Sequence, residues 1–131
     1  MPPIFDCKET HVSMCMRILI VEDHEHTRHV LKRLLQRWGF DVASAPTLQN
    51  GLSFLEAGPF DAIVSDIALP DGTGYALARE AKRRWKHVLA IALSGYSLPG
   101  DINIGRLSGF DYHLTKPVDC QQLRSILPAP A

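Results

Sequence analysis

The chain has 131 residues, 46% of them hydrophobic and 21% charged, which fits one folded domain with a sizeable core. Its 14 basic and 14 acidic residues give a formal net charge of zero, so neither a general nucleic-acid partner nor an anionic membrane is expected. The three scattered cysteines form no disulfide framework and no apolar stretch reaches the length of a membrane span, so we expect a cytoplasmic protein.

The chain divides into three expected segments. Residues 1–15, with Pro2 and Pro3, are interpreted as an irregular leader. Over residues 16–127, apolar strand patterns alternate with amphipathic helix patterns, which predicts one α/β domain, and residues 128–131 are a short tail.

The first part of the domain predicts two strands and two helices. The aliphatic run 18–21 is typical of a strand that is buried on both faces. Asp23 is a possible N-cap for the helix that follows, which ends at Gly39. Residues 40–45 form the second strand, and a second helix ends before Gly58. The apolar faces of the two helices are formed by Val30, Leu31, Leu34, Leu35 and Trp38, and by Leu48, Leu52 and Leu55.

The second part continues the alternation. Residues 62–65 form the third strand, a turn and a helix follow, and residues 88–93 form the fourth strand. A weak helix pattern covers 97–108, where glycine and proline interrupt it. Residues 110–115 form the fifth strand, and Asp119 can cap a final short helix. Five such units with short connections predict right-handed crossovers and a parallel sheet between two helical layers.

Four of the predicted strands are followed directly by polar residues at their C-terminal ends. Glu22 and Asp23 follow the first strand, Asp66 follows the third, and Ser94 and Lys116 follow the fourth and fifth. In an open parallel α/β sheet, ligands bind at this edge. Three carboxylates, a hydroxyl and a lysine gathered there indicate a site for a divalent cation and a phosphoryl group.

The carboxylates suit a hard cation, because without one they would repel each other. Mg²⁺ prefers one or two carboxylates together with waters and phosphate oxygens, and Mn²⁺ is an alternative ion. We assign direct ligation to Asp23 and Asp66 and a water-mediated role to Glu22. A backbone carbonyl just after Asp66, that of Ala68, is expected to complete the shell.

Asp66 is the best nucleophile of this set, since a carboxylate that attacks an activated phosphoryl group forms an acyl phosphate. Lys116 supplies a fixed positive charge for one phosphoryl oxygen, and the Ser94 hydroxyl can bond to another. The product adds about −1.5 to −2 charges at neutral pH, which can draw Ser94 and its loop inward and bias a two-state surface.

These motifs, in this order, resemble those of bacterial response-regulator receiver domains over roughly residues 16–127. The intervals are 43 residues from Asp23 to Asp66, 28 from there to Ser94 and 22 more to Lys116. The resemblance implies a flavodoxin-like sheet of five parallel strands in the order 2-1-3-4-5. It also implies transfer of a phosphoryl group from a phosphohistidine, on a histidine kinase or phosphotransfer protein, to Asp66. The motifs are Val21-Glu22-Asp23, Asp66 with Leu69-Pro70-Asp71-Gly72, Ser94-Gly95 and Lys116-Pro117, whose peptide bond is typically cis in this family.

The resemblance further implies how the signal leaves the domain. The fourth helix, fifth strand and fifth helix form the signalling face of such domains, so the chain is expected to be a monomer or a weak homodimer through that face. Ser94 is one switch residue, and the other position, usually Tyr or Phe, is occupied by His113, which titrates near neutrality. Ala68 and Tyr96 flank the site where water access tunes hydrolysis. The segment 109–119 is most similar to receivers of hybrid sensor kinases.

Other interpretations stay open. A phosphorylation-independent binding module would keep the fold, and failure to bind Mg²⁺ would favour it. A small phosphohydrolase would use Asp66 as its nucleophile, but Ala68 replaces the second acid that such enzymes usually carry. A flavin-binding flavodoxin fits poorly, because the first strand leads into acids rather than a phosphate-binding loop. The histidines at 24, 26 and 29 favour a solvated helix start over a transition-metal site. We expect a signalling domain, not a turnover enzyme, with output through protein contacts.

Overall fold

The computed structural model describes residues 16–95 and 109–127. The leader, Tyr96, the helix expected over 97–108 and the tail lie outside the described residues. In chain order the elements are β1 Arg17–Val21, α2 Glu25–Arg37, β2 Asp41–Ala45, α3 Leu48–Ala57, β3 Ala62–Asp66, β4 Ala68–Leu69, β5 Gly72–Thr73, α4 Gly74–Arg84, β6 Leu89–Ser94, β7 Tyr112–Thr115 and α6 Cys120–Ile126.

The long strands form one five-stranded sheet in the order β2-β1-β3-β6-β7, and every neighbouring pair is parallel. β4 and β5 form a separate antiparallel hairpin. With that hairpin set aside, the strands of the sheet stand in the order 2-1-3-4-5, so the predicted flavodoxin-like fold is confirmed.

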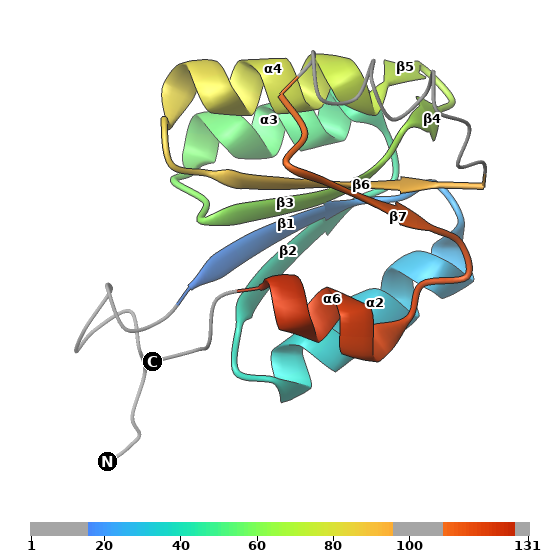
Figure 1. The fold of residues 1–131 in the computed structure, drawn as a ribbon. Helices are drawn as coiled ribbons and strands as arrows, with labels where there is room; N and C mark the ends of the chain where they lie inside the picture. The colour runs from blue at the N-terminus through green and yellow to red at the C-terminus, as the bar shows by residue number, and fades with distance from the viewer. Residues whose placement is uncertain (1–15, 96–108, 128–131) are drawn as a thin grey trace.

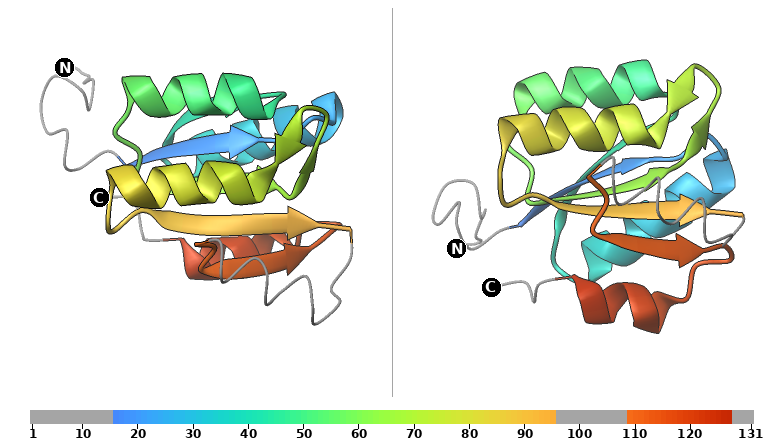
Figure 2. Two further views of the ribbon diagram at one scale, coloured as in Figure 1. Left: turned by 90° about the horizontal axis from the view of Figure 1, so that it is seen from above. Right: turned by 45° about the horizontal axis from the view of Figure 1, so that its top comes forward.

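Helices cover both faces of this sheet. Figures 1 and 2 show α3 and α4 side by side on one face and α2 and α6 on the other. In the described residues, α2, α3 and α4 each return the chain to the start of the sheet before the next long strand, so the strands that they connect run in one direction. Among the described helices, none is both long and apolar enough to cross a membrane.

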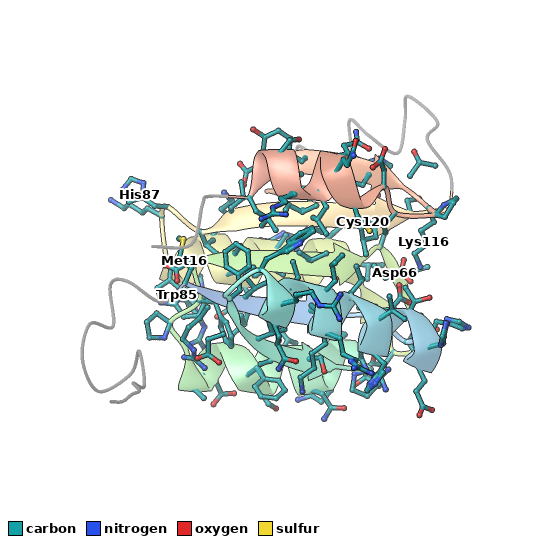
Figure 3. All side chains as sticks on the ribbon, turned by 90° about the horizontal axis from the view of Figure 1, so that it is seen from below. Met16, Asp66, Trp85, His87, Lys116 and Cys120 are labelled. Atoms are coloured by element: carbon teal, nitrogen blue, oxygen red, sulfur yellow. The ribbon has the colours of Figure 1, made fainter. Side chains whose placement is uncertain are left out.

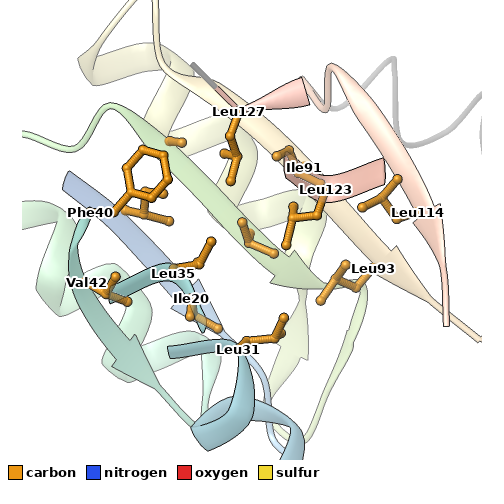
Figure 4. Close-up of a cluster of buried hydrophobic side chains, with 13 residues drawn as sticks. Ile20, Leu31, Leu35, Phe40, Val42, Ile91, Leu93, Leu114, Leu123 and Leu127 are labelled. Carbon is orange, nitrogen blue, oxygen red and sulfur yellow. The ribbon is translucent and has the colours of Figure 1, made fainter. Parts of the chain in front are cut away.

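Two apolar layers hold the sheet between its helices. Figure 4 shows the layer between the sheet and helices α2 and α6, where leucines of these helices meet side chains of the strands. Ile18 and Ile20 of β1 belong to this layer, whereas Leu19 and Val21 belong to the layer on the opposite face, between the sheet and helices α3 and α4. Burial on both faces explains the runs of consecutive apolar residues in the central strands, 18–21 in β1, 62–64 in β3 and 89–93 in β6. The labelled members of the first layer are Ile20, Leu31, Leu35, Phe40, Val42, Ile91, Leu93, Leu114, Leu123 and Leu127.

Three strands begin later than predicted, and for β6, which begins at Leu89, the difference is one residue. β2 begins at Asp41 and β7 at Tyr112, because each follows a turn at a glycine, Gly39 or Gly109, with φ near +100°. The aromatic residue after each of these glycines is buried before its strand pairing begins. Left-handed backbone favours glycine, so these turns limit how early each ladder can start.

The cap of the first helix also differs from the prediction. Asp23 does not cap α2; His24 does, with extended backbone and a ring nitrogen that accepts a hydrogen bond from the Thr27 N–H at 3.3 Å. The helix therefore begins one residue later, and the Asp23 carboxylate is left for other contacts. The predicted cap at Asp119 is confirmed, since its carboxylate accepts from the N–H groups of Gln121 and Gln122.

The two ends of the sheet differ in chemistry. The C-terminal ends of the strands carry the charged residues Asp66 and Lys116, and Figure 3 shows them at one end of the molecule. Trp85 and His87 are labelled at the opposite end, where α4 has run back to the start of the strands. Trp38 follows the last residue of α2 and reaches that end in the same way.

Candidate functional site

The predicted site residues meet because the strands end in register. Asp66 is the last residue of β3 and Ser94 the last of β6, while Glu22 and Lys116 directly follow β1 and β7. Figure 3 shows Asp66 and Lys116 next to each other. The terminal pairs that set this alignment are Val21 with Ser65, Asp66 with Leu93, and Ser94 with Thr115.

Three carboxylates form an acidic cluster at this edge. Glu22, Asp23 and Asp66 each bring one oxygen to within 4.8 Å of the other two. Glu22 is fully buried and Asp66 is 7% exposed, while Asp23 is open to solvent. Burial of two acids this close together is costly unless a positive charge compensates them.

Lys116 supplies that charge. Its Nζ lies 2.8 Å from Oε1 of Glu22 and donates a hydrogen bond to Oδ2 of Asp66 at 2.9 Å. The other oxygen of Glu22, Oε2, accepts from the His24 N–H at 3.1 Å. Burial raises the pKa of the Glu22 carboxyl, and the hydrogen bonds from Lys116 and His24 only partly oppose that rise.

The lysine itself is firmly held in its charged form. Burial alone would lower the pKa of Lys116, but the hydrogen bonds and charges of Glu22 and Asp66 raise it. Its backbone N–H donates to the carbonyl of Ser94 at 2.7 Å, which fixes the start of the loop that carries it. The Lys116–Pro117 peptide bond is cis, as predicted.

The segment after Asp66 is a short, tightly closed loop. Ile67 N–H donates to the carbonyl of Leu93, and Gly74 N–H donates back to the carbonyl of Ile67 at 2.8 Å. Gly74 packs so closely on the main chain that a Cβ there would overlap with the carbonyl oxygen of Asp66. Ala68, whose carbonyl is the predicted last ligand, pairs with Thr73 across the β4–β5 hairpin, and its ligand role stays a prediction.

The two predicted switch residues lie on neighbouring strands. Ser94 is 8% exposed at the end of β6, and His113 is half-buried two residues before the end of β7. His113 pairs with Ala92, while Leu114 packs into the core below the sheet. Within the described residues, Nε2 of His113 is buried without a hydrogen-bond partner. Their movement on activation stays a prediction.

The contacts of three residues in this region were not predicted from the sequence. Arg28 donates to the main-chain carbonyl of Glu22 at 2.9 Å, and His24 supports the Glu22 side chain. Asp71, from the hairpin turn, reaches the first amides of α3. The arginine and histidine lie close in sequence to Glu22, but the contact of Asp71 spans 23 residues and depends on the fold.

The donor set fits a hard divalent cation. It offers carboxylate oxygens only, and two of the three acids are buried against a lysine that a cation could partly replace. Oxygen ligands of this kind suit Mg²⁺ or Mn²⁺, not a metal that prefers sulfur or imidazole. The neighbouring histidines of α2 do not enter this cluster.

Comparisons with known proteins agree with this picture. The family model of the response regulator receiver domain matches residues 18–128. The KDP operon transcriptional regulatory protein KdpE of Escherichia coli is 36% identical over 110 residues, which cover 84% of this chain and 48% of KdpE. The chemotaxis protein CheY of Pseudomonas aeruginosa is 32% identical over 112 residues, which cover 83% of this chain and 90% of CheY. The chain therefore spans about half the length of KdpE and most of CheY.

A solved structure gives the same result. The crystal structure of a CheY-like response regulator receiver domain protein from Methanospirillum hungatei matches with a TM-score of 0.79 and 30% sequence identity, and the match covers 85% of this chain and 89% of that one. Together with the family match over residues 18–128, this shows that the chain belongs to the response regulator receiver domains of two-component signalling.

Proposed function

We propose that Asp66 accepts a phosphoryl group from a phosphohistidine on a histidine kinase or a histidine phosphotransfer protein. The single observation that carries this proposal is the position of Lys116, whose Nζ donates to the Asp66 carboxylate at 2.9 Å beside two further acids. A nucleophilic carboxylate, a fixed cation and a set of metal-ligating oxygens at one point are what phosphoryl transfer to an aspartate requires.

The acidic cluster would hold Mg²⁺, with Mn²⁺ as an alternative. Asp23 and Asp66 act as direct ligands, Glu22 acts through water, and the carbonyl of Ala68 completes the protein's share. Bound there, the ion supplies positive charge that offsets the charge of the transferred phosphoryl oxygens. The exposed position of Asp23 leaves the ion a path from solvent, whereas Glu22 anchors the buried side.

The transfer exchanges one bond to phosphorus for another. A carboxylate oxygen of Asp66 forms a bond to phosphorus while the bond from phosphorus to the donor's imidazole nitrogen breaks, and that nitrogen keeps the electron pair. Lys116 stabilises one phosphoryl oxygen from its place between Glu22 and Asp66, and the Ser94 hydroxyl binds another. These groups are already positioned by strand ends, so little reorganisation is needed.

Phosphorylation then serves as a switch for protein contacts. The added negative charge draws Ser94 toward Asp66 and gives His113 a new environment, which changes the outer surface beside β7. Receiver domains are signalling domains, and we assign this one the same role, with weak self-phosphorylation and acyl-phosphate hydrolysis. The expected homodimer face consists of the helix predicted over 97–108 together with β7 and α6, and residues 97–108 lie outside the described part of the chain.

The test is incubation with acetyl phosphate and Mg²⁺, followed by intact mass measurement. Wild type should gain one phosphoryl group or, with beryllofluoride, form a stable mimic complex, and both should need Mg²⁺. Asp66→Asn should do neither. Asp41→Asn is the matched control, because it makes the same chemical change at the start of β2, at the other end of the sheet.

A folded wild type that gains no mass and binds no mimic would contradict the phosphoacceptor role. It would leave the phosphorylation-independent binding module as the better interpretation. Fast multiple turnover of a phosphomonoester would instead favour the phosphohydrolase.

A further inference from the structure

Asp71 lies at the turn between β4 and β5 but makes its contacts with another element. Its Oδ1 accepts a hydrogen bond from the Leu48 N–H at 2.8 Å, and its Oδ2 accepts from the Gln49 N–H at 2.9 Å. These are the first two residues of α3, so both carboxylate oxygens are used on one helix start. The two partners are 23 and 22 residues away in the chain, which makes this a link between separate elements.

The helix has a cap of its own. Thr47 is the N-cap of α3, and its hydroxyl accepts from the Asn50 N–H at 3.1 Å. The first turn of α3 contains no acidic residue, so Asp71 brings the negative charge that favours a helix start. These two amide hydrogen bonds lower the pKa of Asp71, which keeps the carboxylate ionised at neutral pH.

The other end of the same loop carries the site. The loop begins at Asp66, and its arms are joined by the pairing of Ala68 with Thr73 and by the bond from Gly74 N–H to the Ile67 carbonyl. Gly74 in turn packs against the carbonyl of Asp66 without room for a Cβ. The loop is therefore closed at its base by Gly74 and fixed at its tip by Asp71, with Ala68 between the two.

We propose that Asp71 is a positioning residue for the phosphorylation site: by clamping the tip of the 66–74 loop to the start of α3, it fixes the main chain around Ala68 and Asp66. This inference rests on the proposed function, because it assigns Asp71 a role in cation binding and phosphoryl transfer at that site. It acts through the loop and touches neither cation nor phosphoryl group.

A pair of variants separates positioning from simple helix capping. Asp71→Ala removes both hydrogen bonds to α3 and releases the loop, whereas Thr47→Ala removes a cap of the same helix and leaves the clamp in place. Both should lower Tm. Only Asp71→Ala should weaken Mg²⁺ binding measured by calorimetry and slow phosphorylation by acetyl phosphate, by about tenfold as for other outer supports of metal ligands. Asp71→Asn, which keeps one acceptor oxygen, should fall between Asp71→Ala and wild type.

A third measurement does not depend on the cation. Amide exchange of the Gly74 N–H, followed by NMR in metal-free protein, should speed up in Asp71→Ala and stay unchanged in Thr47→Ala. Wild-type Mg²⁺ affinity and phosphorylation rate in Asp71→Ala would overturn the inference and leave Asp71 as a helix cap. If wild type itself neither binds Mg²⁺ nor accepts the phosphoryl group, the proposed function fails and the positioning role fails with it. The Gly74 exchange then shows whether the clamp alone survives as a structural feature.

Discussion

The ammonium nitrogen of Lys116 lies 2.9 Å from Oδ2 of Asp66, although 50 residues separate the two in the chain. The same nitrogen lies 2.8 Å from Oε1 of Glu22, so the lysine ammonium group lies between two carboxylates, one directly after β1 and one at the end of β3. A divalent ion at this site would therefore compete with the lysine for the carboxylates. The balance between them would set both the stability of the domain and its affinity for such an ion.

Replacing the lysine should make the metal-free protein less stable. In Lys116→Met the side chain keeps its length but leaves buried Glu22 without its charged partner, so the free energy of unfolding should fall by about 2 kcal/mol. Mg²⁺ should stabilise the variant more than wild type, because no lysine competes for the carboxylates. Urea unfolding with and without Mg²⁺ measures both effects.

The control for this variant is Lys86→Met, since Lys86 is exposed after α4 and away from the acids. It should behave like wild type in both conditions. Equal stability of Lys116→Met and Lys86→Met in metal-free buffer would mean that the ion pair with Glu22 contributes nothing.

Neutralising Asp23, the exposed acid, should instead make the metal-free protein more stable. Asp23→Asn removes one of three carboxylates that repel each other, so we expect a higher unfolding midpoint without divalent ions. With Mg²⁺ the order should reverse, because the loss of a direct ligand weakens binding by about tenfold or more. Thermal unfolding across a Mg²⁺ titration gives both the midpoint of the metal-free protein and its affinity for Mg²⁺. Glu25→Gln, the next acid in the chain but outside the cluster, should change neither.

The stability of the metal-free protein should depend on the ionisation of Glu22. Burial raises the pKa of this carboxyl above its ordinary value of 4.5. A group whose pKa is higher in the folded state binds its proton more tightly when the protein is folded. Protonation of Glu22 therefore stabilises the folded protein fully below pH 4.5, and this stabilisation is lost as the pH rises through the folded-state pKa. Mg²⁺ favours the ionised form, so the stabilisation that it gives should grow over the same rise in pH.

Thermal unfolding followed by circular dichroism from pH 4.5 to neutrality tests this dependence, with Glu22→Gln as the comparison. The variant keeps the shape of the side chain and has no carboxyl to titrate, so its curve should be flatter. Parallel curves for the two proteins would show that another group causes the pH dependence.

Two glycines near the site should respond differently to alanine. A Cβ at Gly74 would overlap with the carbonyl oxygen of Asp66 and approach Ser65 Oγ to 2.9 Å, whereas at Gly95 it would meet nothing within 4 Å. Gly74→Ala should therefore cost about 1–3 kcal/mol of stability, as overpacking usually does, and displace the Asp66 backbone. Gly95→Ala should remain near wild type. Urea unfolding and phosphorylation by acetyl phosphate measure the two consequences, and equal behaviour of the variants would contradict the close packing.

Much of the fold could be predicted because each strand is a short apolar run buried on both sides. Such runs are visible in sequence, and the parallel arrangement follows from the helices between them. The site was predictable for the same reason. Asp66 and Lys116 each lie at a strand end, and parallel strands bring those ends together wherever the residues lie in the chain.

What the sequence could not predict depends on exact backbone geometry. Asp23 and His24 are both able to cap a helix, and only the extended backbone at His24 decides between them. The contact of Asp71 with Leu48 joins the β4–β5 turn to the start of α3, and because the packed fold sets their approach, it leaves no local pattern in the sequence. The start of β2 likewise depends on the turn at Gly39.

α2 and α4 run back to the start of the strands, which places both tryptophans away from the acidic cluster of Glu22, Asp23 and Asp66. Trp85 packs edge-on against Phe60 with ring centres 6.2 Å apart, and the guanidinium of Arg124 lies 5.1 Å from the ring centre of Trp38. Intrinsic fluorescence should thus follow unfolding of the two apolar layers and respond little to ion or phosphoryl binding. The two tryptophans thus provide an intrinsic optical reporter of folding that is separate from the proposed switch, whereas a reporter of that switch would have to be introduced at the C-terminal ends of the strands.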